Sequence, residues 1–351
     1  MRGRTLVTSH RLAGVVGVAV LGALLWRAGP AQVWAALRTL SVPALLLTVA
    51  LNLPITLVRN RRTKMVLRRL GHSVGWWSLT RSQLAGQTLS SLTPAAGGDL
   101  VRAWMWRRDD GVPASTGVAV VVFERVLSLV LLLGAGAAFF APTLGGPGLT
   151  AAICTGAAAV IALPWVLAHF GPGRRTAART LTLAARLPVL SRRTQALRRM
   201  GADVGTLAAD TPLLLTFTVT TLAVFVLSGL QIWLLTTGLT ATTSTTLAAA
   251  TGIYGISQAG GSLSALPFGV GPADAIVVGL LLRTGVPFGI GTTVALLLRG
   301  TVTLPIALAA APAVTLGRRA AADQPSNNTP RPTRLPYPAP AAQDLELPAW
   351  H

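Results

Sequence analysis

The fold of this chain follows from the apolar stretch 118–141, which has the sequence VAVVVFERVLSLVLLLGAGAAFFA. A helix of about 20 residues crosses a hydrocarbon core of about 30 Å, so this stretch is long enough to span a membrane. Its only charged residues are Glu124 and Arg125. Charges inside such a helix are costly in lipid, so we expect both side chains to face a cavity or other protein groups.

Five other segments are apolar enough to cross the membrane as helices, the first with the help of its flanking residues. They are residues 12–26, 42–58, 149–169, 213–237 and 290–316. The chain is 52% hydrophobic and 11% charged, whereas a soluble domain has about 25% charged residues. The sequence therefore predicts an all-α, polytopic helical membrane protein with six full spans. A cleaved signal peptide is an alternative for the first segment, but an uncleaved helix fits the many spans that follow.

The Lys and Arg residues lie mainly in the gaps between these segments, and Lys64 is the only lysine. The net charge of +20 therefore does not describe a soluble basic module, and we expect no nucleic-acid partner. Residues 59–69 and 174–199 are rich in Arg and contain no acid, whereas 142–148 and 238–245 carry no charge. Basic loops stay on the cytoplasmic side, which predicts a multi-pass plasma-membrane protein with both termini in the cytoplasm.

Two interrupted stretches predict re-entrant helical hairpins rather than ordinary spans. Residues 81–106 are broken at 93–98, and residues 247–282 are broken at 267–272. The breaking residues are Pro94, Gly97, Gly98, Pro267, Gly269 and Gly271. Proline and glycine end helices, and irregular backbone at membrane depth requires contact with protein or a water-filled cavity. For the second stretch, a pair of full spans remains an alternative.

The two interrupted stretches also resemble each other. Each has a polar helix, a break, an aspartate and then a long helix with an internal arginine. Asp99 precedes Arg125 by 26 positions, and Asp274 precedes Arg299 by 25. The first unit is expected to enter from the cytoplasmic side and the second from outside. This pattern is typical of an inverted-repeat transporter, and chance recurrence of Pro and Gly is the alternative.

Seven charged residues lie inside these apolar or interrupted segments: Asp99, Arg102, Glu124, Arg125, Asp274, Arg283 and Arg299. Asp99 and Arg102 are three apart and share a helix face. Glu124 and Arg125 are adjacent, so their side chains diverge and each requires a partner elsewhere. Asp99 could pair with Arg125, and Arg102 with Glu124. In the second unit, Asp274 could pair with Arg299.

Two hypotheses follow for these charges, and both can hold together. In the first, the ion pairs only fix the hairpins against the long helices. In the second, Arg102, Arg125 and Arg299 also bind the phosphate of a lipid headgroup through planar guanidinium donors. Asp99, Glu124 and Asp274 would then position these arginines.

The sequence gives little support for catalysis. It contains no paired carboxylates, no nucleophile beside a base and no phosphate-binding glycine loop. The single cysteine, Cys154, lies in an apolar run, and the four histidines show no ligand spacing. We therefore expect no metal and no cofactor, and a protein that is not an enzyme is the favoured interpretation.

The chain resembles the transmembrane region of the lysylphosphatidylglycerol synthases, a flippase-like membrane domain that also occurs alone. The motifs are Pro94 to Arg102, with sequence PAAGGDLVR, the pair Glu124-Arg125, Pro267 to Asp274, with sequence PFGVGPAD, and Arg299. The chain departs from the family where Ala95 and Ala96 replace a Gly-Arg pair, where aspartates replace glutamates, and at Ala273. The changes at Ala96 and Ala273 each remove a basic residue, so the headgroup preference of the family does not transfer directly.

The resemblance implies a lipid-handling domain, which we assign to residues 1–316. The Pro-, Ala- and Asn-rich end of the chain, which has no periodicity, predicts a disordered cytoplasmic tail over 317–351. The resemblance implies the membrane half of the synthases without their soluble aminoacyl-transfer domain. The expected function is a flippase or transporter of an anionic phospholipid or a polyprenyl-phosphate-linked lipid. The alternatives are a membrane subunit of an aminoacyl or glycosyl transferase whose catalytic domain is on another chain, and a scaffold without transport. The expected partners are membrane lipids and, in the subunit alternative, a separate enzyme chain.

The connection 171–211 has an amphipathic pattern. Leu197, Met200, Val204 and Leu207 share one helical face. This face is expected to lie on the anionic inner leaflet, and a solvated basic loop is the alternative.

Overall fold

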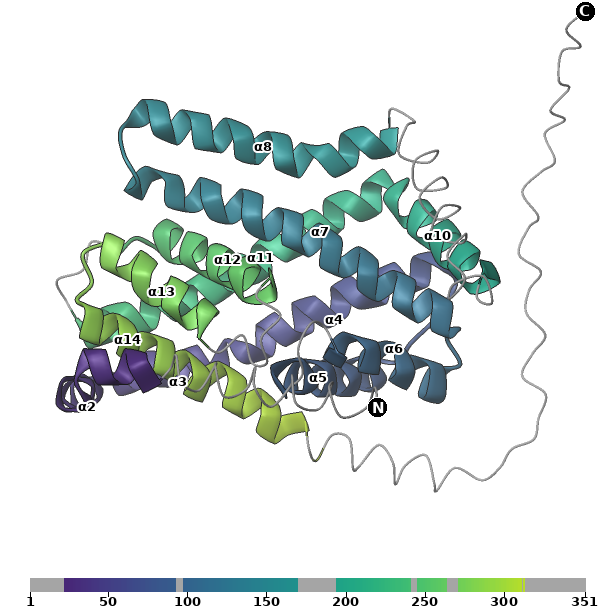
Figure 1. Ribbon diagram of the computed structural model, residues 1–351. Helices are drawn as coiled ribbons and strands as arrows, with labels where there is room; N and C mark the ends of the chain where they lie inside the picture. The colour runs from purple at the N-terminus through teal and green to yellow at the C-terminus, as the bar shows by residue number, and fades with distance from the viewer. Residues whose placement is uncertain are drawn as a thin grey trace, which may run out of the picture.

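The structure, a computed structural model, describes residues 22–92, 97–169, 194–240, 245–263, 271–310 and 312. Within these ranges the chain is helical and contains no strand. The α-helices are α2 (Pro30–Arg38), α3 (Val42–Ala50), α4 (Asn52–Arg69), α5 (Trp76–Leu92), α6 (Gly97–Asp110), α7 (Ala114–Phe140), α8 (Pro147–His169), α10 (Thr194–Ala208), α11 (Thr211–Leu239), α12 (Leu247–Leu263), α13 (Pro272–Arg283) and α14 (Phe288–Leu298). A 3-10 turn, η1 (Ala141–Thr143), follows α7, and a π-helical turn, η4 (Arg299–Thr303), follows α14. The predicted all-α polytopic membrane fold is confirmed (Figure 1).

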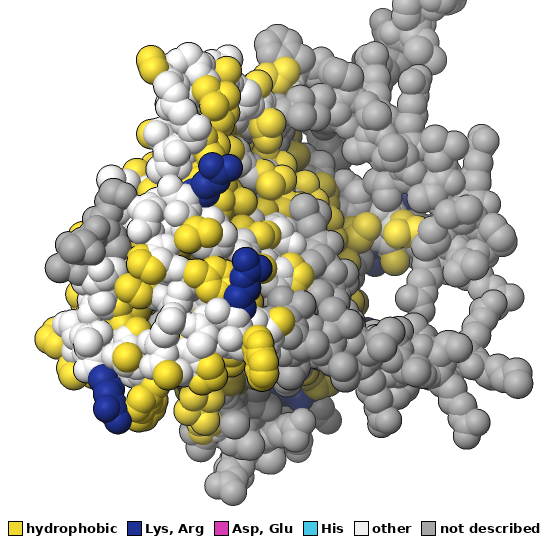
Figure 2. All heavy atoms as spheres, turned by 60° about the vertical axis from the view of Figure 1, so that its left-hand side comes forward, with side chains coloured by type: hydrophobic (Ala, Val, Ile, Leu, Met, Phe, Trp, Pro, Cys, Tyr) yellow, Lys and Arg dark blue, Asp and Glu magenta, His cyan; other side chains and the backbone are white. Residues whose placement is uncertain are grey.

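Four helical stretches are long and apolar enough to cross a membrane: Val42–Arg69, Ala114–Thr143, Thr211–Leu239 and Phe288–Ala310. They correspond to four of the six predicted spans. The fifth corresponds to α8, a helix of 23 residues, and most of the first, residues 12–26, lies outside the described residues. Large hydrophobic side chains are exposed on these helices, and in Figure 2 they spread over the visible face between a few separate basic patches. Such a surface suits lipid rather than water.

The prediction that residues 59–69 form a loop is wrong. Helix α3 continues into α4 through Leu51, whose φ of −62° and ψ of −19° are helical, and α4 ends only at Arg69. No proline or glycine interrupts residues 55–69, and Arg, Lys and Leu are good helix formers. The connection to α5 is therefore confined to residues 70–75, and α4 brings Arg59 and Arg62 in among the other helices.

The two predicted hairpins lie toward opposite ends of the long helices (Figure 1). Helix α5 packs against α6 toward the right-hand end in this view, and α12 packs against α13 toward the left-hand end. The described arms have 17, 14, 17 and 12 residues, fewer than the roughly 20 that a full crossing requires. Helix α7 contacts both α6 and α12, so it lies against both hairpins. These lengths favour the re-entrant arrangement over a pair of full spans.

The two units place their key charges at equivalent positions. Asp99 is the third residue of α6, and Asp274 is the third residue of α13. Arg125 is the twelfth residue of α7, and Arg299 is the twelfth residue counted from the start of α14. The correspondence seen along the sequence therefore also holds in the helices themselves.

The first hairpin depends on a glycine where its arms meet. A Cβ atom added to Gly98 would overlap the carbonyl oxygen of Gly86 and the backbone nitrogen of Ser90. Helices α7 and α12 also meet closely, because a Cβ on Gly255 would lie 2.8 Å from the Cα of Gly136. In a membrane the hydrophobic effect does not drive helices together, so helix association depends on close packing. Small residues allow the helix backbones to approach closely enough for such packing.

Two buried apolar clusters hold the helices together. One surrounds Phe217 and Trp106 and joins α4, α6, α7 and α11. The other surrounds Ile253 and Leu281 and joins α11, α12, α13 and α14. Helix α11 contributes to both clusters, so it connects the two halves of the molecule.

Helix α10 packs against α7. Leu207 of its apolar face is fully buried in the first apolar cluster. The hydroxyl of Thr116 on α7 also donates a hydrogen bond to Asp203 Oδ2 at 2.8 Å. Helix α7 therefore covers this face at Leu207, whereas Leu197, Met200 and Val204 are only half-buried. Contact of the rest of the face with the inner leaflet stays a prediction.

Candidate functional site

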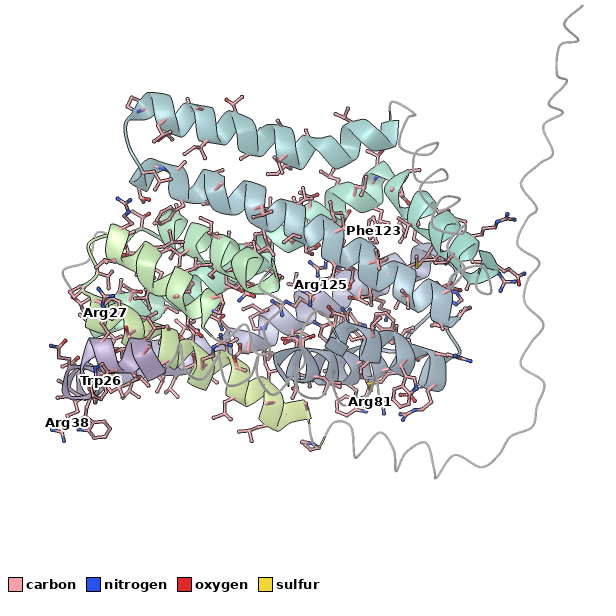
Figure 3. All side chains as sticks on the ribbon, viewed as in Figure 1. Trp26, Arg27, Arg38, Arg81, Phe123 and Arg125 are labelled. Carbon is pink, nitrogen blue, oxygen red and sulfur yellow. The ribbon has the colours of Figure 1, made fainter. Side chains whose placement is uncertain are left out.

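A cavity of about 680 Å³ lies where the two hairpin units meet the long helices. Helices α4 to α7 form its wall from the first half, and α11, α12, α13 and η4 form it from the second. Its lining includes Asp99, Arg102, Glu124 and Arg125 from the first unit and Asp274 and Arg299 from the second. All six charged residues proposed for the site therefore share one cavity, and Figure 3 places Arg125 near the middle of the molecule.

Arg102 and Glu124 form the most buried part of the site. Arg102 Nη2 donates to Glu124 Oε2 at 2.9 Å and to the hydroxyl of Thr63 at 3.0 Å. Thr63 donates in turn to Glu124 Oε1 at 2.7 Å, and Arg102 also lies over the ring of Trp106. Arg102 is 6% exposed and Glu124 is 3% exposed. A buried pair is stable only when its remaining groups are hydrogen-bonded, and this closed triangle provides bonds for both Glu124 oxygens and for Arg102 Nη2, whereas Arg102 Nε has no hydrogen-bond partner within the described residues.

Asp99 connects this buried network to the cavity. Its Oδ1 lies 3.5 Å from Arg102 Nη1, and its Oδ2 accepts a hydrogen bond from Arg125 Nε at 2.5 Å. The Arg125 side chain is 44% exposed, and its two Nη groups make no hydrogen bond within the described part of the chain. Arg125 is therefore held at one nitrogen and presents the rest of its guanidinium to the cavity.

In the second unit, one carboxylate forms a bidentate ion pair with the arginine. Arg299 Nε donates to Asp274 Oδ1 at 3.1 Å, and Arg299 Nη2 donates to Asp274 Oδ2 at 3.0 Å. Asp274 is 4% exposed and also accepts from the backbone nitrogen of Gly271, whose φ of 98° suits glycine. The Arg299 side chain is 27% exposed. The fork geometry leaves part of the guanidinium facing the cavity.

The π-helical turn begins at Arg299 and alters the backbone hydrogen bonding there. Asn52 of α4 donates from Nδ2 to the carbonyl oxygen of Thr301 at 2.7 Å. Gln231 of α11 donates to Asn52 Oδ1 at 3.2 Å and to the carbonyl oxygen of Thr48 at 2.9 Å. Single π-turns inside helices are frequent at functional sites. The side chains of α4 and α11 thus stabilise the irregular backbone next to Arg299.

Sequence reasoning missed two cavity residues, Arg59 and Arg62, because it placed them in a loop. Arg59 Nη2 donates to the hydroxyl of Tyr254 at 3.2 Å. Arg62 Nη1 donates to the hydroxyl of Thr221 at 2.9 Å, and its guanidinium lies 4.6 Å from the ring centre of Phe217. A usable signal was present, because polar residues recur at three- and four-residue spacing from residue 52 to residue 63.

The structure forms the three ion pairs that the sequence suggested: Asp99 with Arg125, Arg102 with Glu124, and Asp274 with Arg299. In the first unit, the Asp99–Arg125 pair and the Arg102–Glu124 pair occur together, and Asp99 also contacts Arg102. Arg283 is exposed at the end of α13 and does not line the cavity. Among the predicted breaking residues, Gly97, Gly98 and Gly271 are described, whereas Pro94, Pro267 and Gly269 lie outside the described residues.

Comparison with known proteins agrees with this geometry. The family model described as the lysylphosphatidylglycerol synthase TM region matches residues 12–310. The match covers both hairpin units and every residue of the cavity wall. No curated protein matches the chain.

Proposed function

The chain belongs to the lysylphosphatidylglycerol synthase transmembrane-region family, and on this premise we propose that it binds the headgroup of an anionic lipid in the central cavity and moves it across the membrane. The observation that carries the proposal is that Arg125 and Arg299 reach one cavity from two equivalent units. Neither guanidinium is fully enclosed by its carboxylate partner. A phosphate offers planar, charged acceptors that match a guanidinium fork.

The wall of the cavity supports a lipid rather than a wholly polar ligand. Alongside the charged residues, it contains apolar side chains of long helices, including Ile55, Leu132, Val224 and Ile306. Ligand sites of roughly 300–1,000 Å³ are common for small molecules, so this volume can hold a headgroup with the first part of its acyl chains. The polar and apolar parts of the wall then contact the corresponding parts of one lipid.

The proposed mechanism is an exchange of partners. In the structure, Asp99 and Asp274 hold the two arginines. An incoming phosphate competes with these carboxylates, so it changes the free energy of each hairpin's contact with its long helix. A ligand shifts a conformational equilibrium only through such a difference in affinity between two states. Alternate opening of the two hairpin units, which lie at opposite ends of the long helices, would then expose the headgroup to one side and the other.

The proposal includes an orientation and a location. Both termini are placed in the cytoplasm of a plasma-membrane protein, with residues 174–199 on the same side. Labelling of single cysteines at positions 191 and 146, in a Cys154→Ala background, distinguishes the sides. The account requires Gly146→Cys to react with an impermeant reagent from outside and Ser191→Cys to be protected, and the reverse result would refute this orientation.

The proposed function is tested by transport in liposomes. The purified chain is reconstituted with fluorescently labelled phosphatidylglycerol or phosphatidic acid, and an impermeant quencher reports which leaflet holds the label. Arg125→Lys and Arg299→Lys keep the charge but lose the fork, so we expect both variants to fold and to lose most of the transport. Arg283→Lys, at the end of α13 and outside the cavity, is the matched control. Full transport by both cavity variants would refute the proposal.

A further inference from the structure

The cavity contains more positive than negative charge. Its charged lining consists of Arg59, Arg62, Arg102, Arg125 and Arg299, with Asp99, Glu124 and Asp274. Five arginines face three carboxylates, so two positive charges have no counter-charge in the wall. The excess belongs to Arg59 and Arg62, because the other three arginines each form an ion pair with one of the acids.

Arg59 and Arg62 are held by neutral groups instead. They lie three residues apart on α4, so their side chains share a face of the helix. Their hydrogen-bond partners are the hydroxyls of Tyr254 and Thr221. Arg62 Nε is buried and has no hydrogen-bond partner within the described part of the chain. Hydroxyl partners orient the two guanidinium groups without neutralising them.

Among the described residues, no other carboxylate is placed to neutralise these two arginines. Of the ten acidic residues in the chain, Asp323, Asp344 and Glu346 follow residue 320. The remaining acids outside the cavity wall have partners of their own: Asp109 with Arg81, Asp110 with Ser78, Asp203 with Thr116, and Asp210 with Arg69. Within the described chain, the two excess positive charges of the cavity therefore have no acidic side chain left to pair with.

We infer that Arg59 and Arg62 form a second anion subsite, so that the lipid headgroup carried in the cavity bears two negative charges, as in a terminal phosphomonoester or a diphosphate. This inference rests on the proposed function and specifies its substrate class. An uncompensated charge away from water is strongly destabilising. A phosphodiester contributes one negative charge and leaves one arginine uncompensated, whereas a zwitterionic headgroup leaves both. A phosphomonoester carries a charge of about −1.5 to −2 at neutral pH.

The cavity also offers hydrogen-bond donors for the additional phosphate oxygens. The hydroxyls of Thr88, Ser90 and Ser128 line it, are buried, and have no hydrogen-bond partner within the described part of the chain. Ser128 lies one helical turn after Glu124 on α7. A buried hydroxyl without a partner costs free energy, and a phosphate oxygen is an acceptor that would remove this cost. A terminal phosphate has more free oxygens to accept these bonds than a phosphodiester has.

The test compares headgroups of different charge on the purified full chain in detergent. The probes are phosphatidic acid, phosphatidylglycerol and phosphatidylcholine with identical acyl chains, each displacing a bound fluorescent lipid. We expect phosphatidic acid to bind about tenfold more tightly than phosphatidylglycerol, because it adds hydrogen bonds to charged groups. Phosphatidylcholine should bind most weakly. Equal affinity for the first two lipids would overturn the two-charge inference while leaving the proposed function intact, and no binding by any of them would overturn both.

Variants of α4 assign the preference to its residues. Arg59→Gln and Arg62→Gln should each reduce the affinity for phosphatidic acid to that for phosphatidylglycerol, whereas Arg59→Lys should retain most of the preference. Arg61→Gln is the matched control, because Arg61 is exposed on α4 and does not line the cavity. An unchanged preference in both Gln variants would overturn the inference. If Arg62→Gln fails to fold, the comparison of Arg59→Gln with Arg59→Lys still tests the inference.

The charge and the acyl chains of the probe can each be varied alone. The second ionisation of a phosphomonoester lies near a pH of about 6, so raising the pH from about 5 to about 8 adds a negative charge to phosphatidic acid only. Its affinity should rise over this interval while that of phosphatidylglycerol stays constant, and parallel profiles would count against a dianion site. Glycerol 3-phosphate carries the same charge without acyl chains. If it bound as tightly as phosphatidic acid, the two-charge subsite would stand and the lipid part of the proposed function would fail.

Discussion

In the first hairpin unit, Asp99 lies between two arginines, whereas in the second unit Asp274 forms an ion pair with one arginine, Arg299, within the described residues. The positions equivalent to Arg102 and Glu124 are occupied in the second unit by Val277 and Leu298. The first unit therefore has a buried four-residue network, and the second has one bidentate pair next to a π-helical turn. From this difference we predict that the first hairpin is more strongly anchored than the second.

The anchoring network should show the largest effect on stability. Glu124→Gln removes the carboxylate that neutralises Arg102 and leaves a buried guanidinium with the distant Asp99 contact. Breaking a buried pair by removing one partner costs about 3–5 kcal/mol, and we expect a loss of this size. Chemical unfolding in mixed micelles measures it. A loss below about 1 kcal/mol, the level of an exposed pair, would show that the network does not anchor the hairpin.

The packing of the two hairpins gives the second comparison. Gly98 precedes Asp99, and the equivalent residue before Asp274 is Ala273. A methyl group on Gly98 would overlap the backbone of α5, so Gly98→Ala should destabilise the protein by about 1–3 kcal/mol through overpacking. Gly156→Ala is the control, because nothing lies within 4 Å of a Cβ there.

The reciprocal substitution sharpens the same comparison. Ala273→Gly removes one methyl group from the second hairpin, and its main cost is the helix propensity of glycine, about 0.5–1 kcal/mol. Both variants are followed by thermal unfolding in the same detergent. For the first hairpin, equal losses of stability in Gly98→Ala and in its control Gly156→Ala would contradict the prediction. They would mean that the arms of this hairpin separate more easily than the structure indicates.

The single pair of the second unit should contribute less than the network of the first. Asp274→Asn removes the charge but keeps one oxygen, which can still accept from Arg299 Nη2 and from the backbone nitrogen of Gly271, while the bond from Arg299 Nε is lost. Because the Arg299 side chain is 27% exposed and can reach water in the cavity, we expect a loss of about 1–2 kcal/mol. The measurement is the same unfolding experiment. A loss of stability greater than that of Glu124→Gln would show that the second hairpin, not the first, is the more strongly anchored.

The sequence predicted most of the helices and the intramembrane ion pairs for a simple physical reason. Only helices satisfy their own backbone in lipid, so apolar length identifies spans directly. Charges in such segments require partners, and few acids were available, which made the pairs of Arg125 and Arg299 predictable. The equivalence of the two units followed from matching spacings in the chain.

The same reasoning failed for α4, a helix that carries several arginines. Arg59 and Arg62 were assigned to a loop because basic residues usually lie outside the membrane, yet α4 continues through them and brings them to the cavity. Hydropathy does not detect a helix whose polar face is covered by other helices. The placement of α10 on α7 was missed for a related reason, because an amphipathic face does not state whether protein or lipid will cover it.

The central claim is that the phosphate of a lipid lies in the cavity between Arg125 and Arg299. An experimental density map of the protein in a lipid nanodisc containing phosphatidic acid tests it most directly. The account predicts a phosphate density within about 3 Å of a guanidinium nitrogen of Arg125 or Arg299, a charge-assisted hydrogen-bond distance, with density for acyl chains leading toward the apolar part of the wall. Lipid phosphate found only on the outer surface of the helices, with Arg125 and Arg299 in contact with water and their carboxylates alone, would contradict it.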